Sequence, residues 1–309
     1  MLLTLTLSLI IGLLLGLLGG GGSILTVPML VYLLHIEPKT AITTSFVVVG
    51  LSSMLALIPH AKRHSVCWKS GIFFGVSGMI GAFAGGRLAA YFTSDLLMTL
   101  FGLISLSTGL LMLRRPKPQA NISPSKQRMN VCPLQVPYLR VLFDGFFVGA
   151  LTGMVGVGGG FLIVPALTLL VGLPMQGAVG TSLMIIVMNA VAGLGGYSQH
   201  AELNLPLTIQ VTGGALIGSA IGAILSGYIK PALLRRGFGL MVVAVGLYVL
   251  SQAFNAQLLT DAEVWFGNAD SEIWIALGLL TVLVLLHIGN WIHKTDAVVF
   301  KPENSADGH

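Results

Sequence analysis

Long apolar stretches, separated by short polar ones, fill most of this chain. Nine of them are apolar enough to be membrane segments: 3–34, 40–59, 70–92, 95–113, 141–172, 176–197, 205–229, 232–252 and 273–292. A transmembrane helix needs about 20 apolar residues, so most of these segments suit a single crossing. Segments 3–34 and 141–172 are too long for one simple span. The pattern predicts an all-α polytopic membrane protein.

Composition agrees with this prediction and excludes several function classes. The chain is 55% hydrophobic and 9% charged, whereas a soluble domain carries about 25% charged residues. The net charge of +5 comes from short loops between the segments, which does not indicate nucleic-acid binding. The glycine runs lack the Gly-Lys-Ser/Thr ending of a nucleotide-binding loop, and no catalytic triad or metal motif occurs. We expect no enzyme activity, no catalytic residue, no metal and no cofactor.

The apolar part of the chain contains an internal repeat. Shifting the sequence by 137 positions aligns 12–113 with 149–250 without a gap, and 29 of the 102 aligned positions are identical. The identities include glycines, a proline and a Thr-Ser pair, which chance alignment of apolar segments rarely preserves. We therefore expect two repeats of four segments each, followed by one extra helix.

Glycines interrupt the first segment of each repeat at the same place. The interruptions read Gly16-Leu-Leu-Gly19-Gly-Gly21-Gly22-Ser23 and Gly153-Met-Val-Gly156-Val-Gly158-Gly159-Gly160, and Pro28 or Pro165 follows. Glycine inside a helix costs about 1 kcal/mol relative to alanine, and broken backbone survives in lipid only when protein or a cavity surrounds it. Paired breaks of this kind point to the binding site of a transporter. Close packing of helices through small residues is the alternative explanation.

The basic loops distinguish two topologies. If every segment crossed once, the basic loops 60–69 and 230–236 would lie on opposite faces of the membrane, against the usual bias of Lys and Arg. If segments 3–34 and 141–172 are instead re-entrant hairpins that turn at the glycines, each repeat has three true spans and the second repeat is inverted. Of the 16 Lys and Arg residues, 14 then face the cytoplasm. We favour the re-entrant topology and keep single crossings as the alternative.

The re-entrant topology divides the chain into six parts. They are a first transmembrane repeat at 1–113, a basic cytoplasmic linker at 114–140, a second transmembrane repeat at 141–252, an acidic extracytoplasmic loop at 253–272, an extra transmembrane helix at 273–293 and a cytoplasmic tail at 294–309. We expect a multi-pass protein in the lipid bilayer of the cytoplasmic (inner) membrane.

Backbone N–H groups and hydroxyls near the glycine breaks are the candidate binding groups. A glycine turn lets the backbone approach a ligand, and a helix N-terminus attracts an anion. The Thr-Ser pair that follows each break either donates to a substrate oxygen or caps the next helix. An amide within a span needs a partner on a neighbouring helix or on the substrate. The predicted substrate-binding residues are Gly19, Gly21, Gly22, Ser23, Thr44, Ser45, Gly156, Gly158, Gly159, Gly160, Thr181, Ser182 and Asn189.

Three histidines, His60, His64 and His200, lie at the ends of loops. Histidine can relay protons near neutral pH. At loop ends, however, solvated side chains are the expected state, so the sequence assigns these residues no role.

At the doubled glycine motif the chain resembles the sulfite exporter TauE/SafE family of membrane transporters. The matching pattern is Gly-x3-Gly-x2-Gly-x-Gly-Gly followed by proline, used twice, with Thr-Ser downstream, and the similarity covers roughly 3–252. The resemblance implies transport of small sulfur-containing anions, such as sulfite or organosulfonates, driven by an ion gradient. The ninth segment and the long linker go beyond the eight-segment pattern of that family.

We therefore expect a secondary transporter that moves a small anion by alternating access around the two glycine turns. Its expected partners are the anionic substrate and a coupling ion, either a proton or sodium, without nucleic acid; a homodimer is the assembly to test. Two alternatives stay open. One is a non-transporting scaffold or accessory subunit, in which the glycines serve packing alone. The other is an anion channel, although no ring of charge or filter motif is visible.

Overall fold

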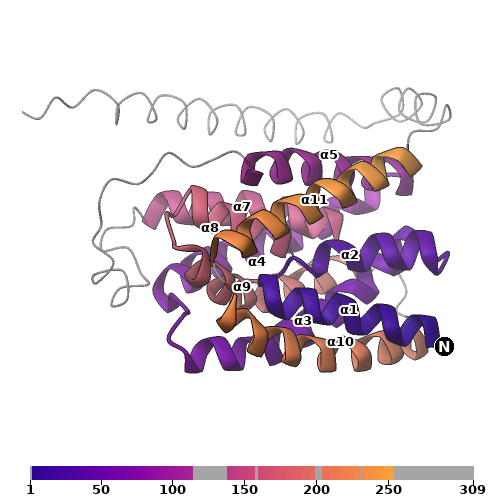
Figure 1. Cartoon of the computed structure of the whole chain (residues 1–309). Coiled ribbons are helices and arrows are strands. Elements are labelled where there is room, and N and C mark those ends of the chain that lie inside the picture. The colour runs from indigo at the N-terminus through magenta and orange to yellow at the C-terminus, as the bar shows by residue number, and fades with distance from the viewer. Residues whose placement is uncertain (1, 114–137, 157–158, 199–203, 230, 254–309) are drawn as a thin grey trace, which may run out of the picture. The chain divides into compact units, whose positions relative to one another are not determined.

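The computed structural model describes residues 2–113, 138–156, 159–198, 204–229 and 231–253 (Figure 1). Every regular element in these ranges is a helix. In chain order they are α1 (Leu2–Leu18), α2 (Ser23–Pro28), the π-helix η1 (Met29–Leu33), α3 (Pro38–Lys62), α4 (Trp68–Leu88), η2 (Ala89–Tyr91), α5 (Ser94–Leu113), α7 (Tyr138–Val155), α8 (Gly160–Leu169), α9 (Met175–Tyr197), α10 (Leu205–Leu225), η3 (Ser226–Tyr228) and α11 (Pro231–Ala253). The predicted linker, acidic loop, extra helix and tail lie outside the described residues, except for a few residues at their edges.

Six of the described helices are long and apolar enough to cross a membrane. They span Pro38–Lys62, Trp68–Tyr91, Ser94–Leu113, Met175–Tyr197, Leu205–Tyr228 and Pro231–Gln252. The broken segments contain only shorter apolar helices, among them Thr4–Leu18, Ser23–Leu33 and Val141–Val155. The prediction of an all-helical, multi-pass membrane protein is confirmed, and these six helices agree closely with the predicted spans in the described residues.

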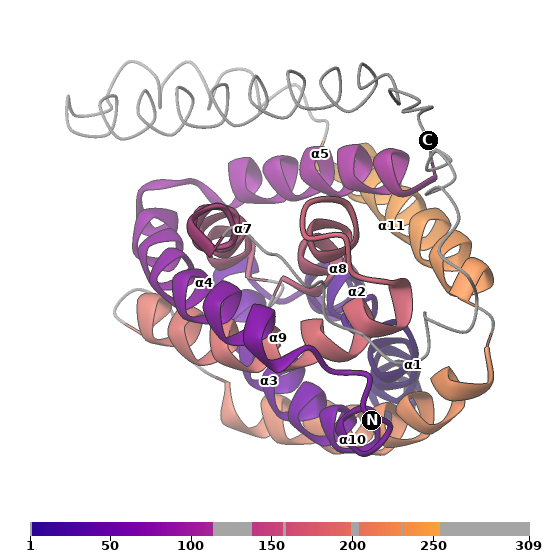
Figure 2. The same ribbon diagram turned by 90° about the vertical axis from the view of Figure 1, so that its left-hand side faces the viewer.

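The two halves of the chain exchange their first helices. Helix α1 packs against α10 of the second half, and its counterpart α7 packs against α4 of the first half (Figures 1 and 2). A Cβ built on Gly12 would lie 2.1 Å from the carbonyl oxygen of Ala215, and a Cβ on the matching Gly149 would lie 2.2 Å from that of Gly78. Because only glycine permits such close approach of two helices, the repeated glycines interlock the halves.

Helices α3 and α9 form the interior of the structure. They pack against each other. Of an apolar 18-residue stretch in α9, 72% is buried, whereas the corresponding share in α11 is 39%. The short helices α2 and α8 lie inward of the longer ones (Figure 2), and α5 pairs with α11 at the periphery. The interior is therefore built from the broken segments and from the spans that follow them.

Both ends of the first broken segment lie beside the N-terminal half of helix α10. At its start, the carbonyl oxygen of Leu5 is 3.2 Å from a Cβ built on Gly214. At its end, Val31 and Leu34 pack on a buried cluster that includes Val211. Between these ends the helix is interrupted at residues 19–22.

Candidate functional site

The interruptions fall at the predicted glycines and need them. In the first turn, Gly19 and Gly20 have φ angles of 64° and 118°; in the second, Gly156 and Gly159 have 75° and 84°. Residues with a Cβ rarely adopt these angles. Gly19 and Gly156 are equivalent in the internal repeat, so both halves leave the first helix through the same backbone conformation.

The two turns contact each other directly. A Cβ built on Gly20 would lie 2.4 Å from the Cα of Gly160, and a Cβ on Gly160 would lie 2.3 Å from the Cα of Gly20. The short helices α2 and α8 begin at Ser23 and Gly160, so both start at or close to this contact. The meeting of the turns is therefore a contact of backbone with backbone.

A serine from each half holds the turn of the other half. Ser45 Oγ donates to the carbonyl oxygen of Gly156, and Ser182 Oγ donates to that of Gly19. Both serines are fully buried. From the sequence, capping of the following helix is one possible role for the Thr-Ser pairs. That alternative is wrong, because α3 and α9 have their N-caps at Glu37 and Pro174, eight residues before each serine.

The two threonines of the Thr-Ser pairs differ in their surroundings. Thr181 Oγ1 accepts a hydrogen bond of 2.9 Å from the backbone N–H of Cys67. Thr44 Oγ1 is buried and has no hydrogen-bond partner among the described residues. A buried polar group without a partner costs about 1–3 kcal/mol, so the hydroxyl of Thr44 is a candidate donor to a ligand.

Asn189 is buried, and neither polar atom of its amide has a hydrogen-bond partner within the described part of the chain. It lies against Gly78 of α4, where a built Cβ would be 2.7 Å from the Asn189 Oδ1. Its counterpart in the first half, Ser52, is also buried without a partner among those residues. A native protein keeps few such groups, and each calls for an explanation such as a bound water or ligand.

Other predicted residues of the first turn have local partners. Ser23 Oγ donates to the carbonyl oxygen of Gly20, so its proton helps to hold the turn. A Cβ on Gly22 would lie 2.2 Å from the carbonyl oxygen of Ile11, and one on Gly21 would lie 2.8 Å from the Cβ of Leu18. These two glycines therefore serve close packing within the broken segment.

Gly158, the predicted tip of the second turn, lies outside the described residues. The predicted site residues thus separate into turn glycines, two serines that join the halves, buried polar groups without partners, and groups committed to packing.

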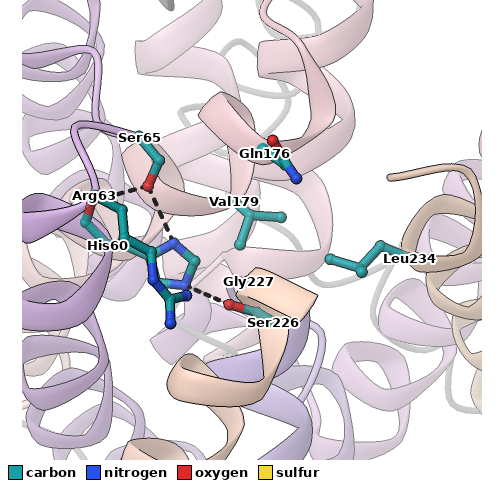
Figure 3. A pocket seen from close by; sticks show the side chains of 8 residues that line it. All are labelled: His60, Arg63, Ser65, Gln176, Val179, Ser226, Gly227 and Leu234. Atoms are coloured by element: carbon teal, nitrogen blue, oxygen red, sulfur yellow. Dashed lines mark hydrogen bonds between the residues drawn. The ribbon is translucent and has the colours of Figure 1, made fainter. Parts of the chain in front are cut away.

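The sequence missed a polar cavity of about 160 Å³. It is lined by groups from the ends of membrane helices and from the segment after α3, including His60, Arg63, Ser65, Gln176 and Ser226 (Figure 3). The expectation of a solvated His60 was wrong, since this side chain is only 5% exposed. Hydropathy places it at a loop end and gives no signal that a neighbouring helix end covers it. In the described ranges, no group of three or more His, Cys, Asp or Glu side chains could hold a metal ion.

Comparison with known proteins identifies the family. Residues 4–249, which include both glycine turns and both Thr-Ser pairs, match the family described as "Sulfite exporter TauE/SafE". A "Probable membrane transporter protein" of Xylella fastidiosa is 35% identical over 244 residues, covering 78% of this chain and 91% of the relative. The "Probable membrane transporter protein YdhB" of Bacillus subtilis is 28% identical over 242 residues, with 78% and 96% covered. No solved structure matches the chain. The chain therefore belongs to the sulfite exporter TauE/SafE family of membrane transporters.

Proposed function

We propose that this protein is a secondary transporter for a small sulfur-containing anion, sulfite or an organosulfonate, with its central site at the two glycine turns. The observation that carries the proposal is the contact between Gly20 and Gly160, with Ser45 and Ser182 joining each turn to the opposite half. Each half therefore supplies one turn and holds the other. Movement of the helices that carry one turn relative to those that carry the other would open and close the site between them, as in transporters built from repeats.

The packing of the helices supports the re-entrant, inverted arrangement. Both ends of the first broken segment lie beside one half of α10, as expected if the chain enters and leaves by one face. The guanidinium of Arg63 donates to the carbonyl oxygens of Ala223 and Ile224 at 3.1 and 2.9 Å. The basic loops 60–69 and 230–236 thus begin near each other, whereas nine single crossings would put them on opposite faces.

The chemistry of the turns favours an anion. Glycines bring backbone N–H groups close to a ligand, and helix α8, ten residues long, starts at Gly160 with its positive end at the contact. Hydroxyl and amide donors lie on the adjacent helices α3 and α9, at Thr44, Ser52 and Asn189. These groups can bind the oxygens of a sulfite or sulfonate group.

The buried polar groups favour a transporter over a scaffold. A protein whose glycines served packing alone would gain by replacing the unpartnered hydroxyl of Thr44 and amide of Asn189 with apolar groups of similar shape. An open channel is disfavoured as well, because the backbones of Gly20 and Gly160 touch where the two turns meet. Alternating access accounts for both observations.

Liposomes that contain the purified full chain test this function. We expect saturable uptake of sulfite and methanesulfonate, and exchange of labelled for unlabelled anion across the membrane. Neutral dimethyl sulfone should neither enter through the protein nor compete. Flux that rises linearly with concentration would indicate a channel, and flux no greater than that of empty liposomes would indicate a scaffold.

The proposal also covers the membrane, the driving force and the assembly. We place the protein in the cytoplasmic membrane with the basic loops inside, and a proton or sodium gradient as the driving force. Dependence of uptake on each imposed gradient identifies the coupling ion. Sedimentation in detergent distinguishes a monomer from a homodimer.

A further inference from the structure

The cavity beside His60 lies outside the glycine turns but adjoins the first of them. Val179 forms part of its lining, and a Cβ built on Gly19 would lie 2.5 Å from a methyl group of Val179. Val179 therefore borders both the cavity and the first turn. The other lining groups come from the end of α3, the segment that follows it, the start of α9, η3 and the start of α11 (Figure 3).

The lining of the cavity is basic and polar. It includes the guanidinium of Arg63, the imidazole of His60 and the amide of Gln176, and none of the described residues that line it is acidic. The hydroxyls of Ser65 and Ser226 complete the polar wall. A cavity with this lining suits an anion and repels a cation.

The basic groups are held in place before any ligand arrives. Arg63 is fixed by its bonds to the carbonyl oxygens of Ala223 and Ile224. A guanidinium has five N–H groups, so others stay available for a ligand. The ring nitrogens of His60 lie 3.3 Å from Ser65 Oγ and 3.2 Å from Ser226 Oγ (Figure 3). Such anchoring lowers the cost of ordering side chains when a ligand binds.

Two described positions of the other half differ from their counterparts in the cavity. The internal repeat aligns His60 with Tyr197, whose side chain is fully buried and donates from its hydroxyl to the carbonyl oxygen of Met154 at 2.6 Å. It also aligns Ser226 with Ala89, which is fully buried. The contact between His60 and Ser226 thus has no equivalent at Tyr197 and Ala89. If the repeats are inverted, the cavity marks one face of the membrane, the face of the basic loops.

We propose that this cavity is a second anion site, at which a small sulfur oxyanion binds to Arg63 and Gln176 on its way to or from the turns. The inference rests on the proposed function for the identity of the anion. The volume of about 160 Å³ is similar to a cavity of roughly 150 Å³ that holds benzene. It therefore has room for sulfite or methanesulfonate.

The test measures thermal stabilisation of the purified full chain by methanesulfonate. Two variants remove separate donors, Arg63→Gln and Gln176→Leu, and Arg87→Gln is the matched control. The control removes one basic charge from an exposed side chain that lies over the ring of Phe83 on α4. Because Arg63 also binds two backbone carbonyls, Gln176→Leu keeps the test valid if Arg63→Gln folds poorly.

We expect both variants to need about tenfold more methanesulfonate, or still more, for half-maximal stabilisation, since each loses a hydrogen bond to a charged ligand. Arg87→Gln should behave as wild type. The same shifts should persist in a Gly158→Val background, where the second turn is altered. Unchanged half-saturation in both cavity variants would overturn the proposal, as would equal stabilisation by neutral dimethyl sulfone.

Failure of this site is distinguishable from failure of the proposed function. Transport that proceeds with an unchanged KM in Arg63→Gln and Gln176→Leu would reject the cavity alone. Wild-type protein that binds methanesulfonate through Arg63 yet transports no sulfur oxyanion would reject the transport function and keep the site.

Discussion

The contact between the glycine turns gives a quantitative prediction for the Gly160→Ala variant. A methyl group on Gly160 would lie 2.3 Å from the Cα of Gly20 and 2.5 Å from its carbonyl oxygen. Both neighbours are backbone atoms, so rotation of a side chain cannot relieve the overlap. Overpacking of this kind costs about 1–3 kcal/mol, so the variant should unfold more readily than wild type.

Gly213→Ala is the matched control. Gly213 lies within α10, and a Cβ built there has no neighbour within 4 Å. Alanine gains about 1 kcal/mol over glycine inside a helix, and the gain at Gly160, the first residue of α8, is no larger. Gly160→Ala should therefore be less stable than Gly213→Ala by at least the overpacking cost, about 1–3 kcal/mol.

The measurement is thermal unfolding of both purified variants in one detergent. A cost of 1 kcal/mol lowers Tm by about 2–4 °C in a domain of 150–250 residues, so the separation is measurable. Equal Tm values for Gly160→Ala and Gly213→Ala would show that the turns do not touch, and would refute the arrangement of the interior.

Three further predictions address the serines, the buried amide and the topology. Ser45→Ala and Ser182→Ala each remove a donor to a buried turn carbonyl and should each lower the free energy of unfolding by about 1–3 kcal/mol. Denaturant titration measures this free energy in both variants. If neither variant were less stable than wild type, the serines would not support the turns. Asn189→Leu removes an amide without a hydrogen-bond partner in the described structure, so the free energy of unfolding should stay the same or rise. The KM for sulfite should rise, and an unchanged KM would exclude the amide from the site. Cysteines at the exposed positions Thr93 and Leu233 should react with a membrane-impermeant reagent from opposite faces, with the parent chain as the blank; reaction from the same face would support nine single crossings.

Hydropathy and glycine spacing predicted most of the fold. A transmembrane span needs a long apolar stretch, and the spans at 38–62 and 175–197 extend only slightly beyond the predicted segments. The glycines marked where each long segment breaks, because positive φ angles are rarely available to other residues. The breaks at Gly19 and Gly156 therefore followed from local chemistry alone.

Contacts between distant residues could not be predicted in this way. Ser45 and Gly156 are 111 positions apart, and an internal repeat says which residues are alike but not which of them touch. The turns meet through Gly20 and Gly160, which are not equivalent positions: the repeat aligns Gly20 with Val157 and Gly160 with Ser23. The difference between Thr44 and Thr181 likewise depends on the backbone of Cys67, which approaches only one of them.

The cavity escaped prediction for a related reason. His60 and Ser226 are 166 positions apart, and each alone resembles an ordinary residue at the end of a span. Only the packing of α3 against α10 brings them together.

Counterflow of labelled sulfite into liposomes tests most directly whether the glycine turns form the transport site. The comparison uses wild type, Gly213→Ala and Gly158→Val, each first shown to be folded by its thermal unfolding. Gly158 lies between Gly156 and Gly159, which both have positive φ angles, and valine adds a β-branched side chain where an anion should approach the backbone. We predict that wild type and Gly213→Ala accumulate labelled sulfite and that folded Gly158→Val does not. A folded Gly158→Val variant with counterflow equal to wild type would contradict the assignment of the turns as the site.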